Sequence, residues 1–301
     1  MANLHRSAVA WLACLIWLAA MGPAQNRPVT STSTEVVEKV AGGFIRSEGP
    51  VWVRQGYLLF SDFEQSRIFR LTPPGEVTLY LDHTGAANGN SMDAQGRFYS
   101  CERDGRRVVR RDAAGSLVVV ADRWEGKKLN SPNDIVVRRD GQIYFTDPAS
   151  AAVKEPQELG FNGVYHVTPS GAISLVAKSL DRPNGVALST DGRILYVADS
   201  SARTITAFDL DEQGGTSGQR TFIRDIAGSP DGLRVAESGN LYIACRGIAV
   251  YSPEAKLLRT IDVPEQPANC AFGDPDLRTL YITARSSLYR VRLPEKGLLQ
   301  Y

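Results

Sequence analysis

The fold is decided by the stretch Gly141-Gln142-Ile143-Tyr144-Phe145-Thr146-Asp147, because the same phrase occurs six times along the chain. Each copy is a turn containing Gly or Asp, followed by an apolar strand that usually has an aromatic residue near its centre. The central residues are Leu59, Tyr99, Tyr144, Tyr196, Tyr242 and Tyr281, at steps of 40, 45, 52, 46 and 39 residues. This period is typical of one four-stranded propeller blade. The sequence therefore predicts an all-β, six-bladed β-propeller.

The way in which the ring closes is also predicted. A candidate outer strand precedes each later blade, and residues 35–40 form a similar segment before the first blade. After the sixth copy the chain has only one further strand, over residues 287–293. The last blade thus lacks its outer strand, and we expect the N-terminal strand to supply it. Such closure removes an open sheet edge that would otherwise invite aggregation.

A second repeated feature is an oxygen-bearing side chain eleven or twelve residues before each central residue. The six residues are Glu48, Asn88, Asn133, Asn184, Asp231 and Asn269. This spacing predicts that each begins the innermost strand of its blade, which lines the central channel. Asn and Asp also favour such positions because their side chains bond to local backbone groups. For a single Asn this structural explanation competes with a functional one.

The two carboxylates of this ring carry the functional argument. Glu48 and Asp231 would repel each other in a channel unless a cation or a proton lay between them. Together with Asn184 and Asn133 they form an all-oxygen ligand set, which favours hard cations such as Ca²⁺ or Mg²⁺. The irregular geometry suits Ca²⁺ best. We therefore expect one divalent cation, with Ca²⁺ first and Mg²⁺, Mn²⁺ or Zn²⁺ as alternatives.

Other polar residues give weaker signals. Asp62, Glu102, Asp147 and Asp199 share the position three residues after the central one, where turn stabilisation is the expected role. Of these, Asp147 is the one that we expect to face the channel and contact substrate. No nucleophile accompanies the histidines, so a Ser/His/Asp triad is not expected.

The composition excludes several classes of protein. The 301 residues include 34 Lys and Arg against 33 Asp and Glu, and a net charge of +1 lacks the basic footprint of a nucleic-acid binder. A hydrophobic fraction of 43% allows a large core. The 3 His and 4 Cys lack metal-binding spacings, which disfavours a zinc site built from nitrogen and sulfur ligands. A small-molecule substrate is the expected partner, and the composition does not predict an oligomeric state.

The N-terminus is interpreted as an export signal. Residues 1–24 have a basic start, an apolar run over 8–20 and a small-residue exit. Because the run is shorter than the ~20 residues that span a bilayer, we expect cleavage rather than an uncleaved anchor, the alternative. Residues 25–34 would form a flexible lead-in, and 35–301 the propeller. The protein would be exported, periplasmic or secreted, and free of the membrane after cleavage. The mature chain retains three cysteines, which allow at most one disulfide: Cys101, Cys245 and Cys270.

Seven stretches carry a family likeness. They are SEGPVW (47–52), LNSPND (129–134), YFTDP (144–148), ELGFNGVY (158–165), RPNGV (182–186), SPDGL (229–233) and NCAFG (269–273). Over residues 35–293 the chain resembles the gluconolactonase, regucalcin and senescence-marker-protein family of six-bladed propellers, and it looks most like the bacterial gluconolactonase branch.

The resemblance implies a site and an activity. In that family the residues matching Glu48, Asn184 and Asp231 bind one divalent cation. The residue matching Asn133 touches substrate or the water on the metal, and the one matching Asp231 is taken as the acid/base. Metal-assisted hydrolysis of a lactone, with a sugar lactone as the default substrate, is therefore the expected activity. Asn133 and Asn88 would hydrogen-bond the substrate or the attacking water.

The chain also departs from the family at the rim of the channel. The bacterial branch usually has His-Gly-Asn where this chain has Arg103-Asp104-Gly105, and it often has Pro-Tyr-Gly at residues 149–151, which in this chain are Ala-Ser-Ala. Animal members carry Arg at the position of Ser131. The expected metal ligands are thus retained while the substrate rim is altered. This leaves two alternatives open: a related metal-dependent esterase or phosphotriesterase, and a non-catalytic propeller that binds a ligand.

Overall fold

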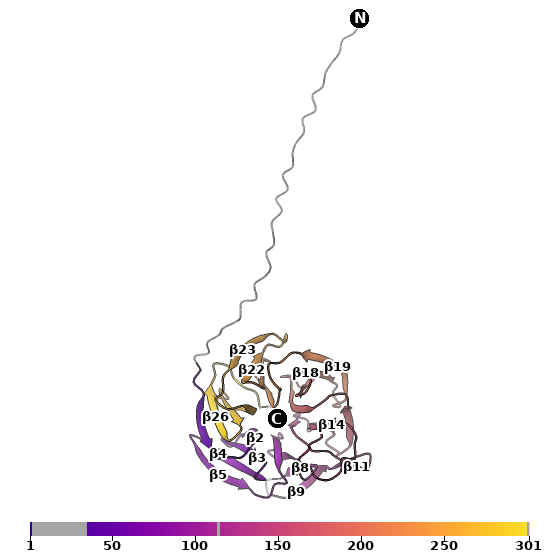
Figure 1. Ribbon diagram of the computed structural model, residues 1–301, viewed down its shortest axis with the longest axis vertical. Coiled ribbons are helices and arrows are strands. Elements are labelled where there is room, and N and C mark those ends of the chain that lie inside the picture. The colour runs from indigo at the N-terminus through magenta and orange to yellow at the C-terminus, as the bar shows by residue number, and fades with distance from the viewer. Residues whose placement is uncertain (2–34, 113–114, 300) are drawn as a thin grey trace. The chain divides into compact units, whose positions relative to one another are not determined.

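The described part of the chain is built from β-strands arranged as blades around a central channel (Figure 1). The computed structural model describes residue 1 and residues 35–112, 115–299 and 301. The predicted signal and lead-in fall on residues that lie, apart from Met1, outside the described ones. Within those described, no helix has the length and apolar composition needed to cross a bilayer. The all-β prediction is confirmed.

Six four-stranded sheets make the propeller, and the strands of each run in chain order from the innermost outward, except in the last blade, whose outer strand is β1. Blade 1 is β2 (Ser47–Val53), β3 (Tyr57–Asp62), β4 (Arg67–Thr72) and β5 (Glu76–Leu81). Blade 2 is β6 (Ala87–Met92), β7 (Phe98–Glu102), β8 (Arg107–Arg111) and β9 (Leu117–Ala121). Blade 3 is β12 (Ile135–Val137), β13 (Ile143–Asp147), β14 (Gly163–Val167) and β15 (Ile173–Ala177).

The other three blades also begin with their innermost strands. Blade 4 is β16 (Pro183–Leu188), β17 (Ile194–Asp199), β18 (Thr204–Leu210) and β19 (Thr216–Ile223). Blade 5 is β20 (Leu233–Val235), β21 (Leu241–Ala244), β22 (Ile248–Tyr251) and β23 (Leu257–Ile261). Blade 6 is β24 (Pro267–Gly273), β25 (Thr279–Ala284), β26 (Ser287–Arg292) and β1 (Glu38–Gly42). A short hairpin of β10 (Arg123–Trp124) and β11 (Lys127–Lys128) lies between blades 2 and 3 in the sequence.

The inner strands hold the ring together. Neighbouring inner strands contact one another around the whole circle, from β2 through β6, β12, β16, β20 and β24 back to β2. All six predicted central residues lie in the second strand of a blade and are buried. These strands are apolar on both faces because each blade packs between two others, which differs from the half-exposed strands of a single sheet. The core is therefore a series of apolar layers between blades.

The predicted closure is confirmed with a small shift in position. β1 pairs antiparallel with β26, so the outer strand of the last blade comes from the N-terminal end of the described chain. The paired residues are 38–42 rather than 35–40. An ion pair between Arg290 and Glu38 (3.0 Å) lies across this pairing, and Arg259 binds Glu35 just before it.

The C-terminal end of the described chain covers one end of the channel, the end toward which the inner strands run. The Tyr301 hydroxyl donates a hydrogen bond to the Trp52 carbonyl (2.6 Å), and Arg54 Nη2 donates one to the Tyr301 carbonyl oxygen (2.6 Å). A small cavity of about 40 Å³ lies between the inner strands and this C-terminal segment, farther along the strands than the predicted channel residues. The three described cysteines, Cys101, Cys245 and Cys270, are buried free thiols.

Candidate functional site

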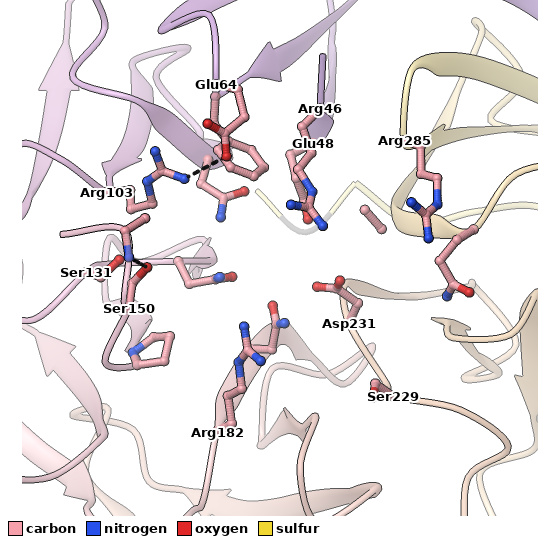
Figure 2. Close-up of a pocket in the computed structure, with 18 of the residues that line it drawn as sticks. Arg46, Glu48, Glu64, Arg103, Ser131, Ser150, Arg182, Ser229, Asp231 and Arg285 are labelled. Atoms are coloured by element: carbon pink, nitrogen blue, oxygen red, sulfur yellow. Dashed lines mark hydrogen bonds and ion pairs between the residues drawn. The ribbon is translucent and has the colours of Figure 1, made fainter. Parts of the chain in front are cut away.

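A cavity of about 780 Å³ opens at the end of the channel where the inner strands begin (Figure 2). Five of the six predicted channel residues line it together: Glu48, Asn88, Asn133, Asn184 and Asp231. The sixth, Asn269, is buried and accepts a hydrogen bond from the Cys270 backbone N–H (2.9 Å). The structure therefore brings together every residue proposed from sequence as a metal ligand.

Local backbone irregularities turn these side chains inward. The pairing of β2 with β3 shifts register between Glu48 and Val51, and that of β16 with β17 shifts between Pro183 and Val186. An extra residue in a strand bends it and redirects a side chain. Glycine follows Glu48 because a Cβ at Gly49 would lie 2.0 Å from a backbone carbonyl of the neighbouring blade. Close approach of the inner strands thus requires a glycine directly after Glu48.

Burial makes the two channel carboxylates unfavourable as a pair of anions. Burial and the nearby charge of Asp231 raise the pKa of Glu48 well above its usual value. Burial and the nearby charge of Asp134 raise the pKa of Asp231 to about 7. Glu48 Oε2 accepts one hydrogen bond, from the Gly49 backbone N–H (2.8 Å). Each carboxylate therefore needs a proton or a cation to offset its charge.

A third buried carboxylate, Asp134, was not predicted from the sequence. Asp134 is 1% exposed and accepts hydrogen bonds from the backbone N–H groups of Ile135 (2.9 Å) and Val186 (3.2 Å). Arg234 Nη1 lies 3.8 Å from Asp134 Oδ2 and forms its ion pair. The sequence did contain a sign that this position is unusual. Four of the other five channel residues are followed by glycine, whereas Asn133 is followed by Asp134.

The carboxylates of the channel fit a divalent cation, and an orphaned amide oxygen beside them fits a hydrogen bond from a further ligand. Among the described residues, neither Glu48 nor Asp231 has an ion-pair partner, while Arg234 pairs with the nearby Asp134. Asn88 Oδ1 is buried without a hydrogen-bond partner, and of the described side chains with such an atom only Asn88 lines the cavity. Nowhere in residues 35–112 or 115–299 do three His, Cys, Asp or Glu side chains converge as ligands. Amide oxygens would therefore have to complete the coordination of an ion.

Asp147 lies away from the cavity, which corrects the expectation that it faces the channel and contacts substrate. Its buried carboxylate accepts hydrogen bonds from the backbone N–H groups of Asn130 (2.8 Å) and Ser131 (2.7 Å). Asp62 and Asp199 bind the corresponding backbone groups of their own blades. The repeated acid thus shapes the loop before the inner strand, as expected for the other members. Glu102 differs, since it pairs with Arg107 (2.6 Å).

The fold and the acidic pocket define a six-bladed propeller with an oxygen-rich binding site in its channel. Residues 46–286 match the family model described as "SMP-30/Gluconolactonase/LRE-like region". The chain belongs to this family.

Three proteins that are similar to this chain in sequence or structure show how much they share with it. A gluconolactonase of Zymomonas mobilis is 33% identical, over 87% of this chain and 82% of that protein. The pentonolactonase XacC of Haloferax volcanii is 27% identical, over 78% and 80% of the two chains. Among solved structures, the gluconolactonase XC5397 of Xanthomonas campestris superposes with a TM-score of 0.81 at 35% identity, covering 87% of this chain and 91% of that one.

Proposed function

We propose that this protein hydrolyses a lactone, most simply a sugar lactone, with the help of one divalent cation held in the channel. The observation that carries the proposal is the meeting of Glu48 and Asp231 in one cavity, as two buried carboxylates that have no ion-pair partner among the described residues. Asn184 and Asn133 line the same cavity and supply amide oxygens. Ca²⁺ is the preferred ion because it accepts oxygen ligands in irregular geometry. The relatives named as gluconolactonase and pentonolactonase support the reaction class.

Different residues of the channel would have different roles in this hydrolysis. When bound, the cation would polarise the lactone carbonyl as a Lewis acid. Asp231 would take the proton of the attacking water through a carboxylate oxygen that does not hold the cation. The unpartnered Asn88 Oδ1 would accept a hydrogen bond from a substrate hydroxyl. Asn133 would orient substrate or water, and the loop that carries it is held by Asp147.

A turnover screen tests this function. Purified protein is assayed on a panel of sugar lactones, aliphatic lactones, aryl esters and a phosphotriester, each with and without a chelator. We expect fastest turnover on a sugar lactone, loss of that turnover in chelator, and recovery when Ca²⁺ is restored in excess. Fastest turnover on an ester or phosphotriester would replace the substrate assignment. Absence of chelator-sensitive hydrolysis across the panel would favour a binding propeller without chemistry.

A further inference from the structure

Arginine is the dominant charge at the mouth of the cavity. Five guanidinium groups line it, from Arg46, Arg103, Arg182, Arg246 and Arg285. They outnumber the three carboxylates that line the same cavity, those of Glu48, Glu64 and Asp231, and no described Lys or His side chain lines it. A bound divalent cation would increase the positive excess further. The mouth is therefore cationic although the channel below it is acidic.

These arginines occupy two equivalent positions of the blade repeat. Arg46 and Arg182 each stand two residues before the channel residue of their blade. Arg103, Arg246 and Arg285 each stand four residues after the central residue of the second strand. Both positions lie in loops at the same face, and this places the five side chains around one opening.

The backbone beneath two of these arginines is fixed. The Arg46 N–H donates to Asp62 Oδ1 (3.0 Å), and the Arg182 N–H donates to Asp199 Oδ1 (3.1 Å). Because each carboxylate is buried behind its loop, the loop cannot shift without breaking these bonds. A ligand bound at this mouth would thus meet side chains that stand on a preorganised backbone.

Four of the five guanidinium groups have no acidic partner at ion-pair distance among the described residues. Arg103 is the exception, since it pairs with Glu64 (3.2 Å) and Asp104 (2.8 Å). Figure 2 shows Arg46, Arg182 and Arg285 around the same opening. Unpaired arginines that share one concave wall repel one another, and their recurrence is difficult to explain by folding alone.

From this arrangement we propose that the substrate is an anionic lactone, one that carries a carboxylate or phosphate group in addition to the lactone ring. Guanidinium groups bind both anions with paired hydrogen bonds, and arginine suits this geometry better than lysine. The uncharged hydroxyls of a neutral sugar lactone would not require several arginines. The inference rests on the proposed hydrolysis and specifies its substrate class.

Matched pairs of substrates test the inference. The carboxylate arm compares glucaro-1,4-lactone with glucono-1,4-lactone, and the phosphate arm compares 6-phosphoglucono-1,5-lactone with glucono-1,5-lactone. We expect kcat/KM to be at least about tenfold higher for the charged member of one pair, as one lost charge-assisted hydrogen bond predicts. The arm with the larger ratio identifies the anion. Added salt should reduce that ratio through screening.

Variants test whether the arginines at the mouth cause the preference for the charged lactone. Arg182→Gln and Arg285→Gln should each lower the charged-to-neutral ratio by about tenfold. Arg193→Gln serves as the matched control, because Arg193 is also exposed but lies in the turn at the opposite end of blade 4. The control should leave the ratio unchanged. Equal or greater kcat/KM for the neutral lactones in both pairs would overturn the inference while leaving lactone hydrolysis intact.

A binding measurement keeps the inference testable if no lactone is turned over. Calorimetric titration compares the dianion glucarate with the monoanion gluconate, and 6-phosphogluconate with gluconate. We expect the more highly charged sugar acid to bind at least about tenfold more tightly, and Arg182→Gln to remove most of that difference. That result without turnover would refute the proposed hydrolysis but support the anion site. Equal affinities in both comparisons would refute the anion site directly.

Discussion

Replacing Asp231 by Asn is expected to lower kcat on the best lactone substrate by at least about a thousandfold. A general base alone contributes about 10²–10⁴-fold, and the substitution also removes one of the two carboxylates that would hold the cation. Asn is nearly the same shape, so the loss would reflect chemistry rather than packing. The measurement is kcat at saturating substrate and saturating Ca²⁺, which separates loss of the base from loss of the ion.

A second readout of the same variant distinguishes function from damage to the fold. Asp231→Asn removes a buried negative charge that repels Glu48. The variant stripped of metal should therefore melt at a higher temperature than the stripped wild-type protein, in line with the usual conflict between activity and stability. Asp209→Asn is the control: this exposed carboxylate on β18 forms only a surface ion pair with Arg220, so the substitution should leave kcat unchanged and the melting temperature nearly so. Near-normal kcat in Asp231→Asn would refute the assignment.

Replacing Arg234 by Met is expected to lower the free energy of unfolding by about 3–5 kcal/mol, the usual cost of leaving one member of a buried ion pair alone. Asp134 would then lack its only described ion-pair partner. The Arg234 side chain also donates hydrogen bonds to the carbonyls of Leu233 (2.7 Å) and Pro50 (3.3 Å), and so links blade 5 to blade 1. Denaturant unfolding in excess Ca²⁺ measures the change.

A double variant shows whether the unpaired charge is the cause. Adding Asp134→Asn to Arg234→Met removes the carboxylate that the first substitution leaves buried. We expect the pair to recover about half or more of the lost stability, since replacing both members of a buried ion pair is often close to neutral. A loss in the double variant equal to the sum of the two single losses would show that Asp134 and Arg234 act independently.

The fold was largely predictable because the signal was repeated. One apolar phrase with a central aromatic occurs six times, and a single copy such as residues 141–147 would have indicated only a strand. The same repetition placed Glu48 and Asp231 in the channel, since equivalent positions of a propeller repeat meet around one axis. Closure by the N-terminal strand followed from counting strands. The exact register of this strand against β26 could not be predicted, because no feature of the sequence indicates the bulge between Lys39 and Ala41.

The details of the site depended on which way individual side chains turn. Asp147 and Asp134 are both acids of blade 3 close to the channel. Two backbone N–H groups hold the first away from the cavity, while the second points inward to Arg234. Such directions are set by contacts between blades, which the sequence of one blade does not contain. Of the five arginines at the mouth, sequence reasoning marked only Arg103, as a departure from the family pattern, although their equivalent positions in the repeat can be read from the sequence.

The central claim is that one cation lies between Glu48 and Asp231, and a calorimetric titration of the metal-stripped protein with Ca²⁺ tests it most directly. We expect one ion per chain, with higher affinity at pH 8 than at pH 6, because the raised pKa values of both carboxyls make protons compete with the ion at the lower pH. Glu48→Gln and Asp231→Asn should each weaken binding by at least about tenfold. Failure of the wild-type protein to bind Ca²⁺, Mg²⁺, Mn²⁺ or Zn²⁺, or binding by both variants as tight as that of the wild-type protein, would contradict the account.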